Sequence, residues 1–154
     1  VGQYPLRCVE VFDRVASRIG RSGGAGFANE APVDGARQKT VAAAVNLANN
    51  FPLSKILVFT HSGTTAQYVS HLRPLSAPIY AFSPDDRVCR RMALLYGVQA
   101  HRMGFQPEPD KNVFSAEAAL LLKGLAVSGD HLVIVTDIVE GDRRHESVQL
   151  RIVP

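Results

Sequence analysis

The chain has 154 residues, of which 46% are hydrophobic and 20% are charged, and its formal net charge is +3. This length is sufficient for one compact domain with a core of its own. The weak positive charge and the lack of Trp argue against a nucleic-acid interface, which needs clustered basic residues and aromatic side chains for stacking. No uncharged apolar stretch approaches about eighteen residues, so no membrane-spanning segment is expected.

The cysteines and histidines show no pattern typical of a metal site or a disulfide framework. Cys8 and Cys89 stand far apart, and two cysteines are too few for a disulfide-stabilised scaffold. None of the five histidines has the spacing of a metal-ligand pair with an acid nearby. We therefore expect no bound metal and a reduced, cytoplasmic environment.

An amphipathic helix is predicted near the start of the chain, over residues 4–20. Pro5 suits its first turn, and its apolar residues recur at spacings of three and four, which places them on one face: Cys8, Phe12, Val15 and Ile19. Residues 21–33 are rich in Gly and Ser and are predicted to be a linker. No strand precedes their Gly-rich run, so it does not match a dinucleotide-binding loop.

From residue 34 onward, helical and strand patterns alternate. The expected helices are 34–50, 64–71, 84–97 and 112–123, with Asp34 and Ser83 as N-caps of the first and the third. The expected strands are short and apolar: 55–60, 78–82, 98–103, 131–137 and 149–153. This order predicts an α/β domain with a five-stranded, mostly parallel sheet flanked by helices. The polar residues 138–147 are expected to be a loop that is too short for a parallel crossover, so the last strand should be antiparallel.

The first strand is expected to run into its helix through a turn that is rich in hydroxyl groups. Open α/β sheets bind ligands beyond the carboxyl ends of their strands. Hydroxyls and close backbone amides come from Thr60, Ser62, Gly63, Thr64 and Thr65, and the helix that follows has unpaired N–H groups. These groups favour phosphate. The alternative is that Ser62, Thr64 or Thr65 only caps the helix.

Arginines elsewhere are weaker candidates for ligand binding. Arg143 and Arg144, in the expected last loop, could bind a second phosphate through bidentate contacts, although solvated surface loops also carry such residues. Arg87, Arg90 and Arg91 are expected on the outer face of their helix.

A serine hydrolase is a further alternative, because Ser62 lies between a strand and a helix. Its partners would be His101 or His131, and Asp137. A nucleophile elbow needs Gly two positions before the serine, and Thr60 stands there, which argues against this alternative.

Several segments together resemble the C-terminal domain of pyruvate kinase, in the same order along the chain. They are ILVFTHSGTTA (56–66), PIYAF (78–82), RRMALLYGV (90–98), Gly129-Asp130 and the terminal RIVP (151–154). The GQYP at residues 2–5 is similar to a G-x-Y-P that this family carries near the end of its catalytic barrel. The resemblance implies a remnant helix of that barrel at residues 1–20 and the C-terminal domain at 34–154.

The resemblance also implies an effector site. In that family a T-x-S-G-x-[ST] turn holds an effector phosphate, and the matching positions here are Thr60, Ser62, Gly63, Thr64 and Thr65. His61 stands where animal enzymes often have Lys. The family's late loop often carries Trp and a Gly-rich run, whereas residues 141–147 are charged here, which leaves Arg143 and Arg144 as candidates for a second phosphate.

Family members transfer a phosphoryl group from phosphoenolpyruvate to ADP in glycolysis, with Mg²⁺ and K⁺ bound on the barrel. No residues here match those catalytic parts, so this segment is expected to be inactive and to hold no cofactor. The resemblance implies an allosteric domain of a cytoplasmic homotetramer, whose partners are a sugar phosphate or nucleotide effector and other subunits. Two alternatives are a purely structural subunit-assembly domain without a ligand and a stand-alone protein of this type.

Overall fold

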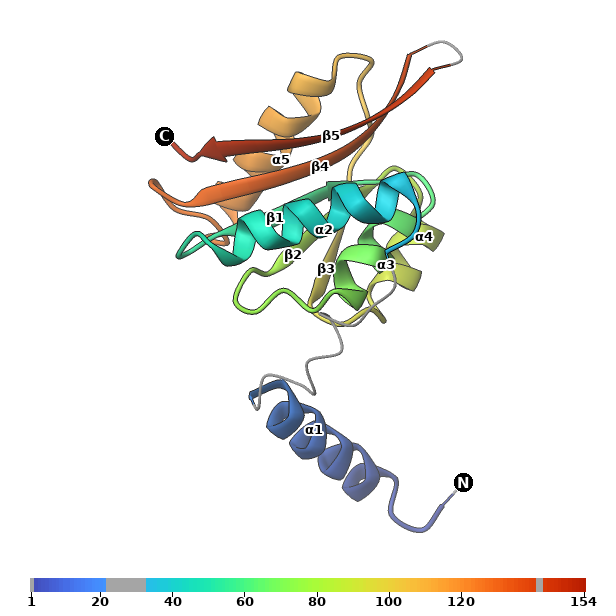
Figure 1. The fold of residues 1–154 in the computed structure, drawn as a ribbon. Coiled ribbons are helices and arrows are strands. Elements are labelled where there is room, and N and C mark those ends of the chain that lie inside the picture. The colour runs from blue at the N-terminus through green and yellow to red at the C-terminus, as the bar shows by residue number, and fades with distance from the viewer. Residues whose placement is uncertain (1, 22–32, 141–142) are drawn as a thin grey trace. The chain divides into compact units, whose positions relative to one another are not determined.

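The computed structural model describes residues 2–21, 33–140 and 143–154, apart from the side chains of 21, 137–140 and 143–145. The chain divides into two compact units, Val1–Ala31 and Pro32–Pro154. The first unit contains α1 (Pro5–Arg21), where the sequence predicts a helix (Figure 1). The predicted linker lies almost wholly outside the described residues. None of the helices in the described ranges has the length and the apolar character that a bilayer crossing needs.

The second unit contains one sheet with helices packed on it (Figure 1). Its helices are α2 (Ala36–Asn49), α3 (Thr64–His71), α4 (Asp86–Met92) and α5 (Pro109–Leu122). Its strands are β1 (Lys55–Phe59), β2 (Ile79–Ser83), β3 (Val98–Arg102), β4 (His131–Glu140) and β5 (Arg143–Ile152). The strand order is β3-β2-β1-β4-β5, and every neighbouring pair is parallel except β4 and β5. The predicted five-stranded, mostly parallel sheet with an antiparallel last strand is confirmed.

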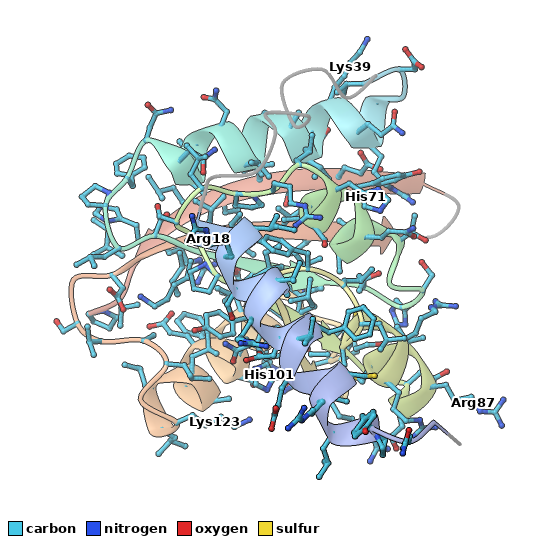
Figure 2. All side chains as sticks on the ribbon, turned by 90° about the horizontal axis from the view of Figure 1, so that it is seen from below. Arg18, Lys39, His71, Arg87, His101 and Lys123 are labelled. Carbon is cyan, nitrogen blue, oxygen red and sulfur yellow. The ribbon has the colours of Figure 1, made fainter. Side chains whose placement is uncertain are left out.

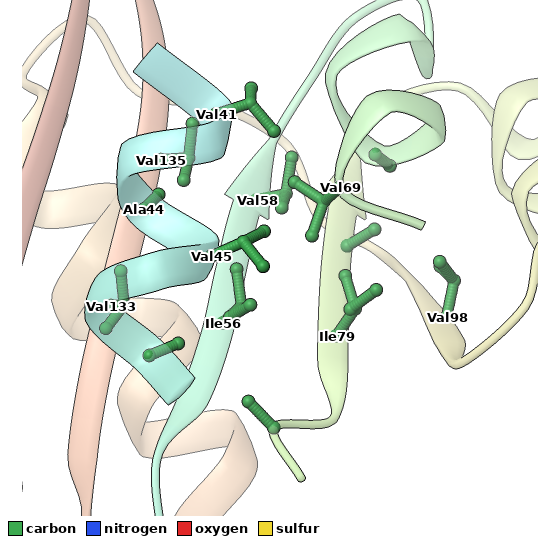
Figure 3. Close-up of a cluster of buried hydrophobic side chains, with 14 of the residues drawn as sticks. Val41, Ala44, Val45, Ile56, Val58, Val69, Ile79, Val98, Val133 and Val135 are labelled. Atoms are coloured by element: carbon green, nitrogen blue, oxygen red, sulfur yellow. The ribbon is translucent and has the colours of Figure 1, made fainter. Parts of the chain in front are cut away.

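Helices cover both faces of the sheet, because its central strands are apolar on both sides. α2, α3 and α4 lie on one face and α5 lies on the other (Figure 1). Successive residues of β1 alternate between these faces: Ile56 and Val58 pack toward α2, whereas Leu57 packs toward α5. Figure 3 shows Val41 and Val45 of α2 pointing at Ile56 and Val58. This packing holds the carboxyl ends of the parallel strands together at one end of the sheet.

The last two strands extend farther than the sequence predicts. β4 runs to Glu140 and β5 begins at Arg143, so residues 138–140 and 143–147, expected to be part of a loop, belong to the two strands of a ribbon. Residues 141–142 lie outside the described part of the chain. The two strands pair without a break over their described lengths. Polar side chains do not prevent this pairing, because the ladder joins backbone groups and a hairpin needs few connecting residues.

The N-cap expected for α2 is wrong. The N-cap is Gly35 rather than Asp34. The side-chain oxygen of Gln38 accepts hydrogen bonds from the backbone N–H groups of Asp34 and Gly35, at 3.0 and 3.1 Å. The helix therefore begins one residue later, and its start is stabilised by an amide inside the first turn.

α4 is shorter than predicted at both ends. Its N-cap is Asp85, whose carboxylate accepts a hydrogen bond from the N–H of Arg87 at 2.7 Å, while Ser83 is the last residue of β2. A carboxylate at this position also interacts favourably with the positive end of the helix. After Met92 the chain continues in turns as far as Gly97, which has a φ of +70°.

The substitution Asp85→Ala is expected to lower the free energy of unfolding by about 1 kcal/mol, because α4 loses its cap. Asp34→Ala is the matched control, since Asp34 does not cap α2, and its effect should stay within about 0.5 kcal/mol. Urea unfolding followed by circular dichroism measures both values. Equal losses in the two variants would contradict the assignment of the cap.

Candidate functional site

The strand order of the sheet reverses between β1 and β4. From β1 the chain proceeds to β2 and β3 on one side, whereas β4 lies on the other side of β1. Such a reversal opens the sheet beyond the strand ends, where α/β folds bind ligands. Phe59 pairs with Thr136 at this end of the two strands, and the Thr60–Thr65 turn follows directly. The topology therefore places the predicted phosphate turn at this reversal of the strand order.

The turn is held in shape by its own hydroxyl groups. Thr60 is 4% exposed, and its Oγ1 accepts a hydrogen bond from the N–H of Gly63 at 2.9 Å. Ser62 Oγ and Thr64 Oγ1 lie 3.0 Å apart and hydrogen-bond to each other nearer the surface. Gly63 has a φ of +83°, a left-handed conformation that favours glycine. The hydroxyl of Thr60 is thus used inside the turn, whereas those of Ser62 and Thr64 lie on its outside.

The N-terminus of α3 has almost no side-chain cap. Its N-cap is Gly63, which has no side chain to contribute, and the N–H of Thr64 reaches Ser62 Oγ only at 3.4 Å. The N–H of Gln67 is the first to bond back into the helix, to the carbonyl of Gly63. The N–H groups before it, that of Thr65 among them, have no intrahelical acceptor. A capping role for the turn's hydroxyls is therefore limited to one long contact.

Arg91 of α4 reaches the same turn. Its side chain is exposed, as expected, but its guanidinium donates a hydrogen bond to the carbonyl oxygen of Ser62. None of the described carboxylates forms an ion pair with it. The sequence carries no signal for this contact, because Arg91 reaches the turn through the packing of its helix, in which Val88 lies against Gly63. A positive charge without an acidic partner among the described residues therefore lies beside the turn.

His61 follows the carboxyl end of β1 and lies on the same face of the sheet as α5. Its ring makes an edge-to-face contact with Phe105, with centroids 5.0 Å apart and planes at 82°. Phe105 in turn contacts the ring of Phe59 at the end of β1. His61 is thus held by an aromatic contact, on the opposite side of the turn from the helix that carries Arg91.

α2 and the β4–β5 ribbon lie on the remaining side of the turn. Arg37 Nε and Glu146 Oε1 form an ion pair at 2.7 Å. Thr136 Oγ1 and Ser147 Oγ, also 2.7 Å apart, share a hydrogen bond. The cavity between these groups and Thr65 has a volume of about 10 Å³, enough for about one water. Polar contacts therefore close this flank, and a phosphate has to approach the turn from its solvent side.

The second pair of predicted ligands falls outside what the structure places. Arg143 and Arg144 belong to β5, where their backbones pair with Glu140 and Val139. Their side chains lie outside the described residues. Their role in binding a second phosphate stays a prediction.

The hydrolase alternative finds no support in the described side chains. Ser62 Oγ contacts Thr64, and no described histidine hydrogen-bonds to it. His131 is the first residue of β4, at the amino end of the parallel strands and away from the turn, where it stacks on Phe51. His101 Nδ1 lies 3.0 Å from Lys123 Nζ instead. In the same described part of the chain, no group of three or more His, Cys, Asp or Glu residues is placed to hold a metal ion.

Residues 38–150 match the family model of the pyruvate kinase alpha/beta domain. The chain belongs to this family. Isozyme G of pyruvate kinase from Ricinus communis, a chloroplastic protein, is 32% identical over 150 residues, which are 95% of this chain and 35% of that protein. The pyruvate kinase of Agrobacterium vitis is 30% identical over 143 residues, which are 87% of this chain and 28% of that protein. The chain thus spans about a third of the length of these relatives, or less.

The fold is shared with a solved pyruvate kinase. The enzyme of Cryptosporidium parvum, solved in complex with ADP, superposes with a TM-score of 0.74 over 82% of this chain and 25% of its own, at 23% sequence identity. Because the sequence identity is below 25%, this likeness shows a shared fold and nothing more. The predicted kinship with the C-terminal domain of pyruvate kinase and the predicted fold class are both confirmed.

Proposed function

We propose that this chain is the effector-binding and subunit-contact domain of a glycolytic pyruvate kinase, and that the Thr60–Thr65 turn holds the effector's phosphate. The geometry of the turn carries this proposal. The start of α3, the hydroxyls of Ser62 and Thr64, and the guanidinium of Arg91 come together in one small region. Membership of the pyruvate kinase family supports it.

A phosphate dianion complements these groups in charge and in hydrogen bonding. The start of a helix carries roughly half a positive charge and unpaired N–H groups. The hydroxyls of Ser62 and Thr64 can rotate to donate to an anion. Arg91 has further N–H groups besides the one that binds the Ser62 carbonyl, and such charge-assisted bonds are strong. Arg91 thus supplies the positive charge that animal enzymes often obtain from Lys at the position of His61.

A second phosphate would bind on the β4–β5 ribbon, at Arg143 and Arg144. β4 is parallel to β1, so the carboxyl end of β4 lies at the same end of the sheet as the turn. A bisphosphate held by both segments would link the turn to the ribbon. Regulation follows if this linked arrangement suits one packing of the subunits better than another, because an effector shifts an equilibrium only by its differential affinity.

The proposal assigns catalysis to a longer protein. The relatives are about three times as long as the part that this chain matches. Phosphoryl transfer from phosphoenolpyruvate to ADP, with its Mg²⁺ and K⁺ ions, would take place on that additional part. We place no metal or nucleotide cofactor in this chain, and we propose a homotetramer in the cytoplasm, although the Ricinus relative is chloroplastic.

Ser62→Asp is expected to weaken effector binding at least about tenfold, because a fixed carboxylate would repel the phosphate. Titration calorimetry of the chain with fructose 1,6-bisphosphate, glucose 6-phosphate and AMP measures this change. Ser76→Asp is the matched control, since it adds the same charge at an exposed position just before β2. This position is at the amino end of the parallel strands, away from the turn.

Two outcomes would overturn the phosphate site. One is that none of the three compounds binds the unmodified chain at concentrations of about 1 mM, which an effector site should reach. The other is that Ser62→Asp binds as tightly as Ser76→Asp. Binding that is lost only with Asp at position 62 supports the proposal.

The alternative of a purely structural assembly domain also has an observation in its favour. Large apolar side chains on α5 are exposed, among them Phe114 at 61% and Leu122 at 88%. Surfaces of this kind are typical of protein contacts. Light scattering in parallel with the calorimetry separates the two functions, because the structural domain would form oligomers and bind none of the three ligands.

A further inference from the structure

A second cavity lies on the face of the sheet that α5 covers, beside the edge strand β3. Its volume is about 170 Å³, and it is lined by Phe82, His101, Arg102, Met103, Ser115, Ala119, Leu120 and Lys123. The cavity exists because a single helix covers this face. α5 packs over β1, β2 and β4, where it buries Leu57, Tyr80 and Leu132, and leaves the outer part of β3 uncovered. The cavity contains no residue of the Thr60–Thr65 turn.

The walls of the cavity are mainly apolar. Phe82 and Leu120 are about 1% exposed and form its floor, and Met103 is packed against the same cluster. The ring of His101 stacks on Phe82, with centroids 5.4 Å apart and planes at 26°. An engineered cavity of roughly 150 Å³ in another protein binds benzene. The size and the flat ring stack therefore suit a small planar or branched body of about that size.

One positive charge at this cavity has no acidic partner among the described residues. Lys123, at the C-cap of α5, places Nζ 3.0 Å from His101 Nδ1 (Figure 2). None of the described ion pairs includes Lys123, whereas Arg102 is paired with Asp86 at 3.3 Å. The Lys123 side chain is exposed, so water solvates the ammonium, and a bound carboxylate would replace part of that water with a charge-assisted hydrogen bond.

His101 is kept neutral by its surroundings. Burial of the ring, and then the charge of Lys123, lower its pKa. With Nδ1 accepting from Lys123, the ring proton is on Nε2, which is buried and has no hydrogen-bond partner among the described residues. The other titratable groups near the ring are Tyr80 on β2 and Arg102 on β3. An anion beside Lys123 would reduce the repulsion that the ring proton experiences.

We propose that this cavity binds a small organic monocarboxylate, with its carboxylate on Lys123 Nζ and its apolar body between Phe82, Met103 and Leu120. The site is separate from the effector turn and does not depend on the function proposed above. A lining without Asp or Glu disfavours amino acids, whose ammonium group would find no partner there. The mainly apolar walls favour a ligand with an apolar body, which an organic carboxylate has and inorganic phosphate lacks.

Benzoate is the probe, and benzamide is its neutral analogue of the same shape. ¹H–¹⁵N NMR titrations of the full chain measure both affinities, and benzoate should bind with a dissociation constant on the order of millimolar, as expected for so small a ligand. Lys123→Met, which keeps an unbranched apolar side chain, should weaken benzoate binding about tenfold. Lys111→Met is the matched control on the same helix, because Lys111 pairs with Glu108 and does not line the cavity.

A second variant tests the cavity without changing the charge. Ala119→Leu places a larger side chain in the cavity and should abolish benzoate binding while Lys123 is intact. Benzoate should also raise the pKa of His101 in an NMR titration of its ring proton, and Ser62→Asp should leave benzoate binding unchanged.

The proposal is overturned if benzoate does not bind at about 20 mM, well above the expected millimolar constant. Equal affinity for benzamide and benzoate, or an unchanged affinity in Lys123→Met, would overturn it as well. Shifts that map to the Thr60–Thr65 turn instead of β3 and α5 would show that benzoate occupies the effector site. That result would remove the second site and leave the effector proposal standing.

Discussion

Replacement of Lys55 by Met is expected to lower the free energy of unfolding by about 3 kcal/mol. Lys55 Nζ and Asp130 Oδ2 form an ion pair at 2.5 Å, and the two side chains are 12% and 3% exposed. Asp130 also accepts a hydrogen bond from the N–H of Val127 at 2.7 Å, so it cannot turn toward solvent without losing that bond. The substitution leaves a buried carboxylate without its cation, which costs more than the loss of an exposed pair.

The matched control for Lys55→Met is Lys111→Met. Lys111 and Glu108 also form an ion pair, at 3.4 Å, but both side chains are 59% exposed. Exposed pairs contribute little, so this variant should lose no more than about 0.5 kcal/mol. The double variant Lys55→Met, Asp130→Asn should recover part of the loss, since the neutral amide still accepts from Val127. Equal losses in the two single variants would contradict the argument.

The effect of Lys55→Met should depend on pH. Burial alone would raise the pKa of Asp130, but the hydrogen bonds from Lys55 and Val127 outweigh it and lower the pKa below the ordinary value of 3.8. A carboxyl group whose pKa is lower in the folded state stabilises the fold above its unfolded pKa. That contribution is lost as the pH falls through the folded pKa. Urea unfolding at neutral pH and at about pH 3 should therefore show a smaller difference between the wild type and the variant in acid.

The fold could be predicted from sequence wherever burial alone determines structure. Ile56 to Phe59 form an uninterrupted apolar run, which is typical of a parallel strand buried on both faces. The extension of the β4–β5 ribbon cannot be predicted in this way, because residues 138–140 and 143–147 are mainly polar and pair through their backbones. The sequence alone does not identify the cap of α4, because Ser83 and Asp85 are both good caps. The choice between them depends on Ser83 pairing with Arg102 in the sheet, a contact between distant segments.

Some residues of the candidate site could be predicted from the sequence, and others could not. The Thr60–Thr65 turn could be predicted because its residues are contiguous and its topology follows from the strand order. Arg91 and Phe105 could not be assigned to it, since they come from α4 and from the loop before α5 and reach the turn only through packing. The cavity at His101 and Lys123 likewise joins residues 22 positions apart. Sequence patterns identify local groups of ligands, whereas charges supplied by neighbouring elements require the structure.

Replacement of Gly63 by Ala is expected to lower the free energy of unfolding by about 2 kcal/mol or more and to weaken phosphate binding strongly. The φ of +83° is unfavourable for any residue with a Cβ. The new Cβ would also lie 3.2 Å from Met92 Cγ and 3.3 Å from Val88 Cγ1, closer than such contacts allow without movement. The side chains of Met92 and Val88 have to move by a few tenths of an ångström, or the turn or α4 shifts, and a shift of α4 moves Arg91 away from Ser62.

Gly124→Ala separates the two causes of this loss. Gly124 has a φ of +66°, and nothing lies within 4 Å of its added Cβ, so this variant carries the backbone strain alone, about 1 kcal/mol. The additional loss in Gly63→Ala measures the contact between the turn and α4. If the two variants lose equal stability, that contact contributes nothing. If Gly63→Ala is less stable yet binds the bisphosphate as well as Gly124→Ala does, phosphate affinity does not depend on how closely α4 approaches the turn, and Arg91 has no part in the site.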